Sequence, residues 1–206
     1  MGEADFFSAS TGAAVEEAVR AVEACTAAEL VVAARRRAAA WSAVDLAVGA
    51  VAGFVTLLLL LFHPYEFPVT GMPAAVLLVF GLAWWFSSSL WGWKRRLLRR
   101  RAVDEAVATA AKAAFVDLGV SRTSGRTGVL VVFFLLERRV ELVADIGVDP
   151  LPLAETRARL QTAFASVDFA GFIAALRALG PVLGAQLPRS EDDLNELPDS
   201  LVSDAR

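Results

Sequence analysis

The sequence predicts an α/β protein, a small α/β sandwich with a central sheet of at least three strands and flanking helices, interrupted by a two-helix transmembrane hairpin. Two apolar segments, residues 41–62 and 72–93, predict the hairpin because each is long enough to cross a bilayer core. Short apolar strands and amphipathic helices lie on both sides of this pair. The chain is 56% hydrophobic, above the about 45–50% of soluble domains.

Residues 1–37 are predicted to form the N-terminal part of the soluble domain. Residues 12–26 have the apolar spacing of an amphipathic helix, and residues 29–34 that of a short strand. Cys25 falls on the apolar stripe of this helix, so we expect a packed, unreactive thiol. As the one cysteine, it excludes an intrachain disulfide. No basic stretch followed by an apolar run begins the chain, so we expect no cleavable signal peptide.

The membrane hairpin is predicted over residues 38–101, including its basic flanks. The first span carries one charge, Asp45, and the second carries none. Both spans are apolar on every face, unlike a helix at the surface of a soluble protein. Asp45 lies about one turn inside its span. We expect its carboxylate to reach the interface or the adjacent Arg35–Arg37 run, with a functional proton site as the alternative.

Basic residues lie just before and just after the hairpin in sequence, but not in the loop that joins its two helices. Arg35–Arg37 precede it, six further Lys and Arg residues lie within 94–101, and the loop 63–71 has neither. The positive-inside rule therefore predicts a two-pass protein of the cytoplasmic membrane, with both termini cytoplasmic and loop 63–71 outside. The lipid bilayer is an expected partner. We expect the basic runs to set topology, with recognition of anionic lipid as the alternative.

Residues 102–187 are predicted to form the C-terminal part of the soluble domain. We expect the strand at 29–34 to pair with the two later strands, because a two-stranded hairpin by itself is marginally stable. Residues 188–206 are an acidic tail. The predicted elements of the C-terminal part are a helix at 102–118, a hairpin of strands at 129–136 and 140–145, a helix through Leu153 and Phe164, and a helix through Phe172 and Leu179 capped by Asp168.

A family resemblance rests on the predicted strand pair. Residues 123–131 have a threonine–glycine entry, and residues 137–148 have a charged turn followed by an aspartate at the end of the strand. This pattern resembles the TPM domain family, founded on TLP18.3, Psb32 and MOLO-1, in its bacterial membrane-embedded branch with two transmembrane helices. Residues 26–32 look like the family's first strand, and residues 192–199 look like a tail of this branch. The resemblance implies a bacterial inner membrane protein and the same α/β sandwich.

The resemblance also implies a candidate metal site, because some relatives bind calcium through acidic residues near strand ends. The matching acidic position is Asp145, with Asp149 four residues later and Glu29 on the neighbouring first strand. A hard cation needs about six or more oxygen ligands, which these carboxylates and backbone carbonyls would begin to supply. The alternative is that Asp145 bonds backbone amides of its own turn. We therefore expect either no cofactor or a bound calcium ion.

The sequence lacks the motifs of common enzymes, including a Walker loop, a dinucleotide fingerprint and a nucleophile elbow. The one histidine, His63, lies in the loop 63–71. A net charge of −3 argues against nucleic acid as a partner. We expect a non-enzymatic accessory or scaffolding protein for a membrane protein partner, or a homo-oligomer. A phosphatase-like or calcium-dependent hydrolase using the strand-end carboxylates is the alternative, followed by a channel or transporter.

Overall fold

The fold is described from a computed structural model of the 206-residue chain. The chain divides into two compact units, residues 1–38 with 101–206, and residues 39–100. The first unit is an α/β domain and the second is a helical hairpin. The residues described by the structure are 9–38, 41–65, 67–89, 100–189, 197 and 201–203.

The α/β domain contains a mixed sheet with the strand order β3-β2-β1-β4. β1 (Leu30–Arg35) pairs in parallel with β2 (Val129–Phe134), which pairs antiparallel with β3 (Arg139–Ala144). The predicted pairing of the first strand with the later strand pair is confirmed. A short strand that was not predicted, β4 (Val202–Ser203), pairs in parallel with β1 at the other edge. All six residues of β2 are buried, as its unbroken apolar run requires.

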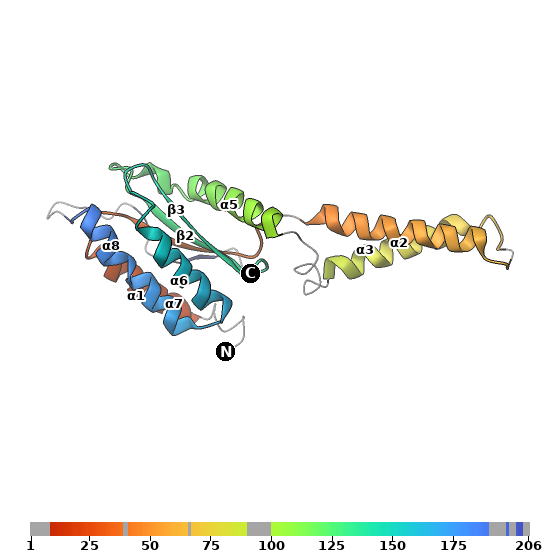
Figure 1. Cartoon of the computed structure of the whole chain (residues 1–206), viewed down its shortest axis with the longest axis horizontal. Helices are drawn as coiled ribbons and strands as arrows, with labels where there is room; N and C mark the ends of the chain where they lie inside the picture. Colours follow the sequence, from red (N-terminus) through yellow and green to blue (C-terminus); the bar gives the residue numbers. More distant parts are fainter. Residues whose placement is uncertain are drawn as a thin grey trace. The chain divides into compact units, whose positions relative to one another are not determined.

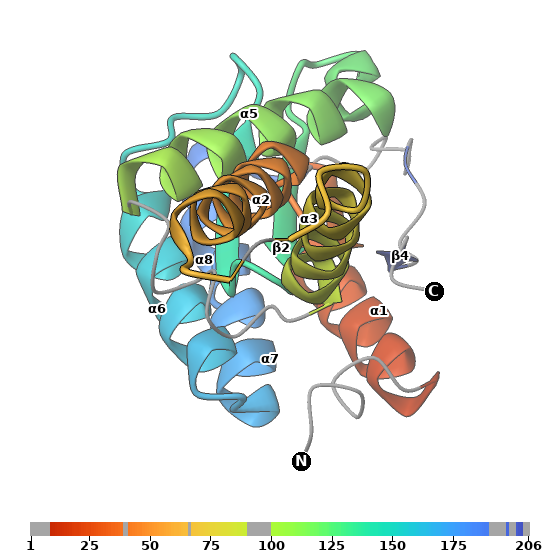
Figure 2. The ribbon, with the colours of Figure 1, turned by 90° about the vertical axis from the view of Figure 1, so that its right-hand side faces the viewer.

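Helices cover both faces of this sheet. Figures 1 and 2 show α5 on one face and α1, α6, α7 and α8 on the other. Because successive strand residues point to opposite faces, β2 directs Phe133 toward the four-helix layer and Phe134 toward α5. Two apolar cores result, one on each side of the sheet. The helices are α1 (Ala9–Glu23), α5 (Arg100–Asp117), the 3-10 helix η2 (Val120–Arg122), α6 (Leu153–Ala165), α7 (Phe169–Arg177) and α8 (Leu179–Gln186).

The prediction that Cys25 is buried is wrong. α1 ends at Glu23, so Cys25 lies in the following turn and is exposed, with its thiol directed at the carbonyl oxygen of Ala21. The helix ends early because Thr26 fixes the chain to the end of α8. The Thr26 hydroxyl donates to the carbonyl oxygen of Leu187 at 2.8 Å, and it accepts the N–H of Ala28 at 3.1 Å.

The hairpin unit consists of α2 (Ser42–Phe62) and α3 (Met72–Ser89), which pack side by side. Gly49 lies directly against α3, since a Cβ there would be 3.1 Å from the ring of Phe80. Small residues of this kind allow membrane helices to approach closely. The outer faces of both helices expose large apolar side chains, as a bilayer-crossing pair does. These exposed residues include Val51, Phe54, Leu59, Leu61, Leu77 and Leu78.

Asp45 is buried inside the hairpin unit. Its Oδ1 accepts a hydrogen bond of 2.5 Å from the hydroxyl of Ser87, which is also buried. Such a bond satisfies polar groups that a hydrocarbon environment leaves unsolvated. The sequence analysis did not predict Ser87 as a partner of Asp45, because the contact depends on how α2 and α3 pack.

Three segments of the described chain are long and apolar enough to cross a membrane, namely α2, α3 and residues 169–186. The third segment covers α7 and α8, and its large apolar side chains lie in the core of the α/β domain. Phe172, Leu176, Leu179 and Leu183 are fully buried there. The third segment is therefore part of the domain core, and α2 and α3 fit a bilayer.

Some predictions fall outside the described residues. They concern the last four residues of the second predicted span, including Trp91 and Trp93, the basic run 94–99, and the acidic tail over 190–196 and 198–200.

Candidate functional site at the ends and edge of the sheet

Two of the three predicted metal ligands lie at the same end of the sheet. The N–H of Val129 donates to the carbonyl oxygen of Glu29 at 2.7 Å, and the N–H of Asp145 donates to that of Gly128 at 2.9 Å. Glu29 and Asp145 therefore lie at corresponding positions on either side of β2. Two strand spacings, roughly 10 Å, separate their backbones.

Asp145 is buried, with its side chain 3% exposed, and its carboxylate is already bound by the protein. Its Oδ1 accepts the N–H of Ile146 at 2.8 Å, which is a turn contact of the kind expected as the alternative to metal binding. The Arg126 Nε lies 3.1 Å from Oδ2 and 3.3 Å from Oδ1. Within the described part of the chain, this ion pair is the only polar contact of Oδ2. Arg126 thus neutralises the strand-end carboxylate.

The loop before β2 holds Arg126 in place. Arg126 has a φ of 54°, in the left-handed region, and its carbonyl oxygen accepts the N–H of Gly147 at 2.9 Å. A Cβ at Gly147 would be 2.6 Å from that oxygen, so this close approach requires glycine. The buried hydroxyl of Thr123 accepts the N–H of Thr127 at 3.1 Å within the same loop. The two loops therefore fix one another by backbone contacts.

Asp149 and Glu29 are engaged elsewhere. The exposed Asp149 accepts the N–H of Leu151 at 3.0 Å through Oδ1, and its own N–H donates to Gln186 Oε1 at 2.9 Å. Glu29 accepts the N–H of Leu197 at 3.4 Å. Among the described residues, no three acidic, histidine or cysteine side chains are grouped to hold a metal ion. The described residues do not bring these three carboxylates together as one ligand set, and the metal site stays a prediction.

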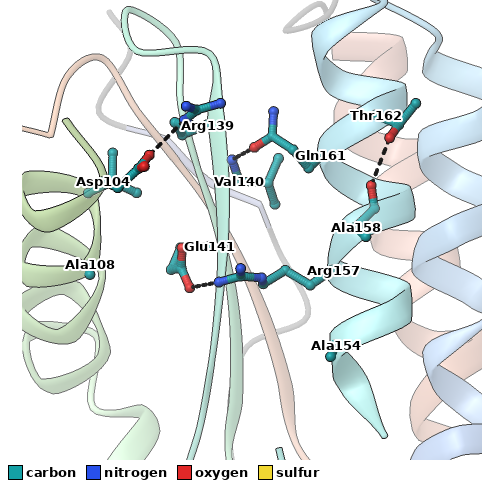
Figure 3. A pocket seen from close by; sticks show the side chains of 11 residues that line it. Asp104, Ala108, Arg139, Val140, Glu141, Ala154, Arg157, Ala158, Gln161 and Thr162 are labelled. Carbon is teal, nitrogen blue, oxygen red and sulfur yellow. Dashed lines mark hydrogen bonds and ion pairs between the residues drawn. The ribbon is translucent and has the colours of Figure 1, made fainter. Parts of the chain in front are cut away.

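A groove of about 730 Å³ runs along the outer edge of β3, between α5 and α6. Small side chains leave this space open, and the sequence analysis did not predict it. Figure 3 shows the groove with its lining side chains. They are Asp104, Val107 and Ala108 of α5, Arg139, Val140 and Glu141 of β3, and Ala154, Arg157, Ala158, Gln161 and Thr162 of α6.

Ion pairs tie β3 to the helix on each side of the groove. Arg139 Nε lies 3.2 Å from Asp104 Oδ1 on α5. On the other side, Arg157 Nη1 of α6 lies 2.5 Å from Glu141 Oε1. Figure 3 shows Arg139 directed at Asp104, and Arg157 extending from α6 to Glu141. The groove walls therefore carry charges of both signs, already matched within the domain.

Gln161 binds the edge of β3 as a neighbouring strand would. Its Oε1 accepts the N–H of Val140 at 2.9 Å, and its Nε2 donates to the carbonyl oxygen of Arg138 at 3.0 Å. In an antiparallel pair, alternate residues direct both backbone groups away from the partner strand. Leu142 and Ala144 share the alternation of Val140, so their backbone groups also point away from β2, at the same edge of the sheet. Among the described strands, β3 pairs only with β2.

Together these features define a class of protein, a small α/β domain with helices on both faces of a mixed sheet and an apolar helical hairpin inserted in its chain. The chain is similar in structure to the BA42 protein of the psychrophilic bacterium Bizionia argentinensis, which was solved by NMR. The TM-score is 0.57 at 16% identity, with 96% of this chain and 95% of that chain covered. This similarity shows a shared fold. No protein-family model matches the sequence, and no curated protein matches it.

Proposed function

We propose that the protein is a membrane-tethered, TPM-like domain that acts as a non-enzymatic accessory or scaffolding protein for a membrane protein partner. The observation that carries this proposal is the groove along the edge of β3, with its outward-facing backbone groups. The basic flanks of the hairpin support an orientation in the bacterial inner membrane with both termini in the cytoplasm and loop 63–71 outside. The partner's binding segment would then be cytoplasmic.

An extended segment of the partner fits this groove best. Strand addition at a sheet edge uses backbone hydrogen bonds for affinity and side-chain pockets on alternate faces for specificity. The backbone groups of Leu142 and Ala144, which continue the edge of β3 beyond the residues that line the groove, offer the hydrogen bonds. Ala108 on α5, and Ala154 and Ala158 on α6, leave room for side chains on the two faces. Gln161 limits the segment at one end, because its amide already occupies the position beside Val140.

Site-specific photocrosslinking in membranes tests this proposal. A photoreactive residue at Ala108 is expected to capture one discrete protein, while the same residue at the exposed Val116 on α5 does not capture it. The variant Ala158→Trp fills the groove and should abolish capture from position 108, whereas Val116→Trp should leave it unchanged. Capture that is insensitive to Ala158→Trp would contradict the groove as the binding site. A product of twice the chain mass would identify the partner as a second copy.

A second candidate, a calcium-dependent or phosphatase-like hydrolase, has one observation in its favour. Asp145 Oδ2 is buried and, among the described residues, is held by Arg126 alone, whose side chain is half exposed; in this proposal a cation takes the place of the guanidinium. Under the leading proposal, millimolar calcium does not raise the stability of the α/β domain. Under the hydrolase proposal, stability rises with calcium concentration through mass action.

Denaturant unfolding of the full chain with and without calcium separates the two candidates, with Asp145→Asn as the test variant and Asp117→Asn as its control. Asp117 is exposed at the end of α5. A calcium-dependent gain in the wild-type protein and the Asp117 variant, lost in the Asp145 variant, would favour the metal site. Hydrolysis of a phosphate ester that disappears in the same variant would overturn the accessory role.

A further inference from the structure

Six arginines gather at one end of the sheet in the α/β domain. We call this region the arginine end and define it as Arg35, Arg36, Arg37, Arg101, Arg138 and Arg139. The N–H groups of Leu135 and Leu136 donate to the carbonyl oxygens of Arg35 and Arg36, each at 3.1 Å. These bonds bring the turn between β2 and β3, which carries Arg138, to the end of β1. The ion pair from Arg139 to Asp104 brings in the first turns of α5.

The two sets of arginines come from distant parts of the sequence. Arg35–Arg37 and Arg101 flank the hairpin, so a topology signal explains them. Arg138 and Arg139 lie far beyond the roughly 15–20 residues next to a span that the positive-inside rule counts. Topology therefore does not explain the turn arginines. In the folded domain, Arg138 and Arg139 lie at the end of the sheet where β1 ends and α5 begins, and these are the two elements of the domain next to the hairpin in sequence.

The described residues at this end carry more positive than negative charge. The first turn of α5 has no acidic residue, and Arg101 lies in it, at the positive end of the helix dipole. Arg36, Arg37 and Arg101 are exposed to solvent. Among the described residues, the acidic side chains on the elements of this end are Asp104, Glu105 and Glu137, and Asp104 is paired with Arg139. Over the described residues, six arginines therefore face three acidic side chains at the arginine end.

We propose that the arginine end binds the anionic headgroups of membrane phospholipids, with Arg138 and Arg139 adding to the arginines that flank the hairpin. Guanidinium groups bind phosphate oxygens through paired N–H donors, and basic clusters beside a membrane span are attracted to anionic lipid. This inference rests on the membrane attachment in the proposed function, but it does not require the groove partner. The lipid contact holds the domain in one orientation at the membrane surface.

Lipid selectivity of the full chain, reconstituted in vesicles, tests the proposal. Association of spin-labelled phosphatidylglycerol is compared with that of spin-labelled phosphatidylcholine. Wild-type protein should prefer the anionic lipid, and Arg138→Gln/Arg139→Gln should reduce the preference at least fivefold, since each basic residue near an anionic surface contributes roughly that factor. Arg138→Lys/Arg139→Lys keeps the charge and should retain most of the preference.

A matched control variant and a competition experiment with free phosphate make the outcome decisive. Arg122→Gln/Arg159→Gln removes the same charge from η2 and α6, outside the arginine end, and should leave the preference unchanged. An unchanged preference in the Arg138/Arg139 glutamine variant would overturn the proposal. So would inorganic phosphate abolishing the preference where chloride of equal ionic strength does not, because the site would then take free phosphate. Co-flotation of the chain with vesicles reports on membrane attachment separately.

Discussion

We expect Phe133→Ala to lower the unfolding free energy of the α/β domain by about 3–5 kcal/mol. Phe133 is 1% exposed and lies on the central strand β2, with its ring centroid 5.5 Å from that of Phe164 and 5.8 Å from that of Phe172. Truncation removes the aromatic contacts and leaves a cavity between the sheet and the four-helix layer. Phe133→Leu should cost less, because it keeps most of the apolar volume.

The measurement must report on the α/β domain and not on the hairpin. All five tryptophans and the one tyrosine lie between Trp41 and Trp93, so their fluorescence follows the hairpin. Pulse proteolysis across a urea series in detergent measures the domain instead. Val116→Ala is the matched control, since Val116 is 62% exposed and should change stability by no more than about 0.5 kcal/mol. Equal effects of the two truncations would contradict the assigned core.

We expect Gly128→Ala to cost at least about 3 kcal/mol, near the upper range for overpacking a folded interior. A Cβ at Gly128 would lie 2.2 Å from the carbonyl oxygen of Val120 and 2.7 Å from its Cγ1. Val120 is fully buried in η2, and a backbone oxygen cannot rotate away as a side chain can. The substitution must therefore separate η2 from the start of β2, which disturbs the loop that positions Arg126.

The same chemical change at Gly12 provides the control. Gly12 lies in α1, and nothing is within 4 Å of a Cβ placed there. Alanine is favoured over glycine inside a helix by about 1 kcal/mol, so Gly12→Ala should stabilise the domain slightly. Stability of both variants is measured by the same urea series. A Gly128→Ala protein as stable as the wild type would show that η2 does not pack as described.

The hairpin and the strands could be predicted because their signals are local. The apolar segment 41–62 differs from α2 (Ser42–Phe62) by one residue, and α3 begins at Met72 as predicted. β2 ends at Phe134 and not at Leu136, because the last two apolar residues turn toward β3 while still bonding to the end of β1. Whether a segment forms a helix or a strand follows from its composition and its hydrophobic periodicity. The residue at which the helix or strand ends depends on its contacts in the folded domain.

The side chains of the candidate site were less predictable. Asp145 was recognised from its place at a strand end, but its pairing with Arg126 depends on a left-handed residue in another loop. The helical spacing predicts Cys25 on an apolar stripe, but α1 ends at Glu23, because Thr26 bonds to Leu187, a residue distant in sequence. Gln161 carries no sequence signal, since its role exists only because β3 is an edge strand.

Local patterns in the sequence are sufficient to predict the α/β class, the interruption of the domain by an apolar hairpin, and the pairing of the first strand with the later two. These follow from hydrophobic period, length and the need to complete a sheet. Three features become visible only in the folded chain: the unpaired edge of β3 among the described strands, the Asp45–Ser87 bond, and the position of Arg138 at the same end of the sheet as Arg35. Each of these joins residues that are distant in sequence, and packing, not local propensity, selects which distant residues meet.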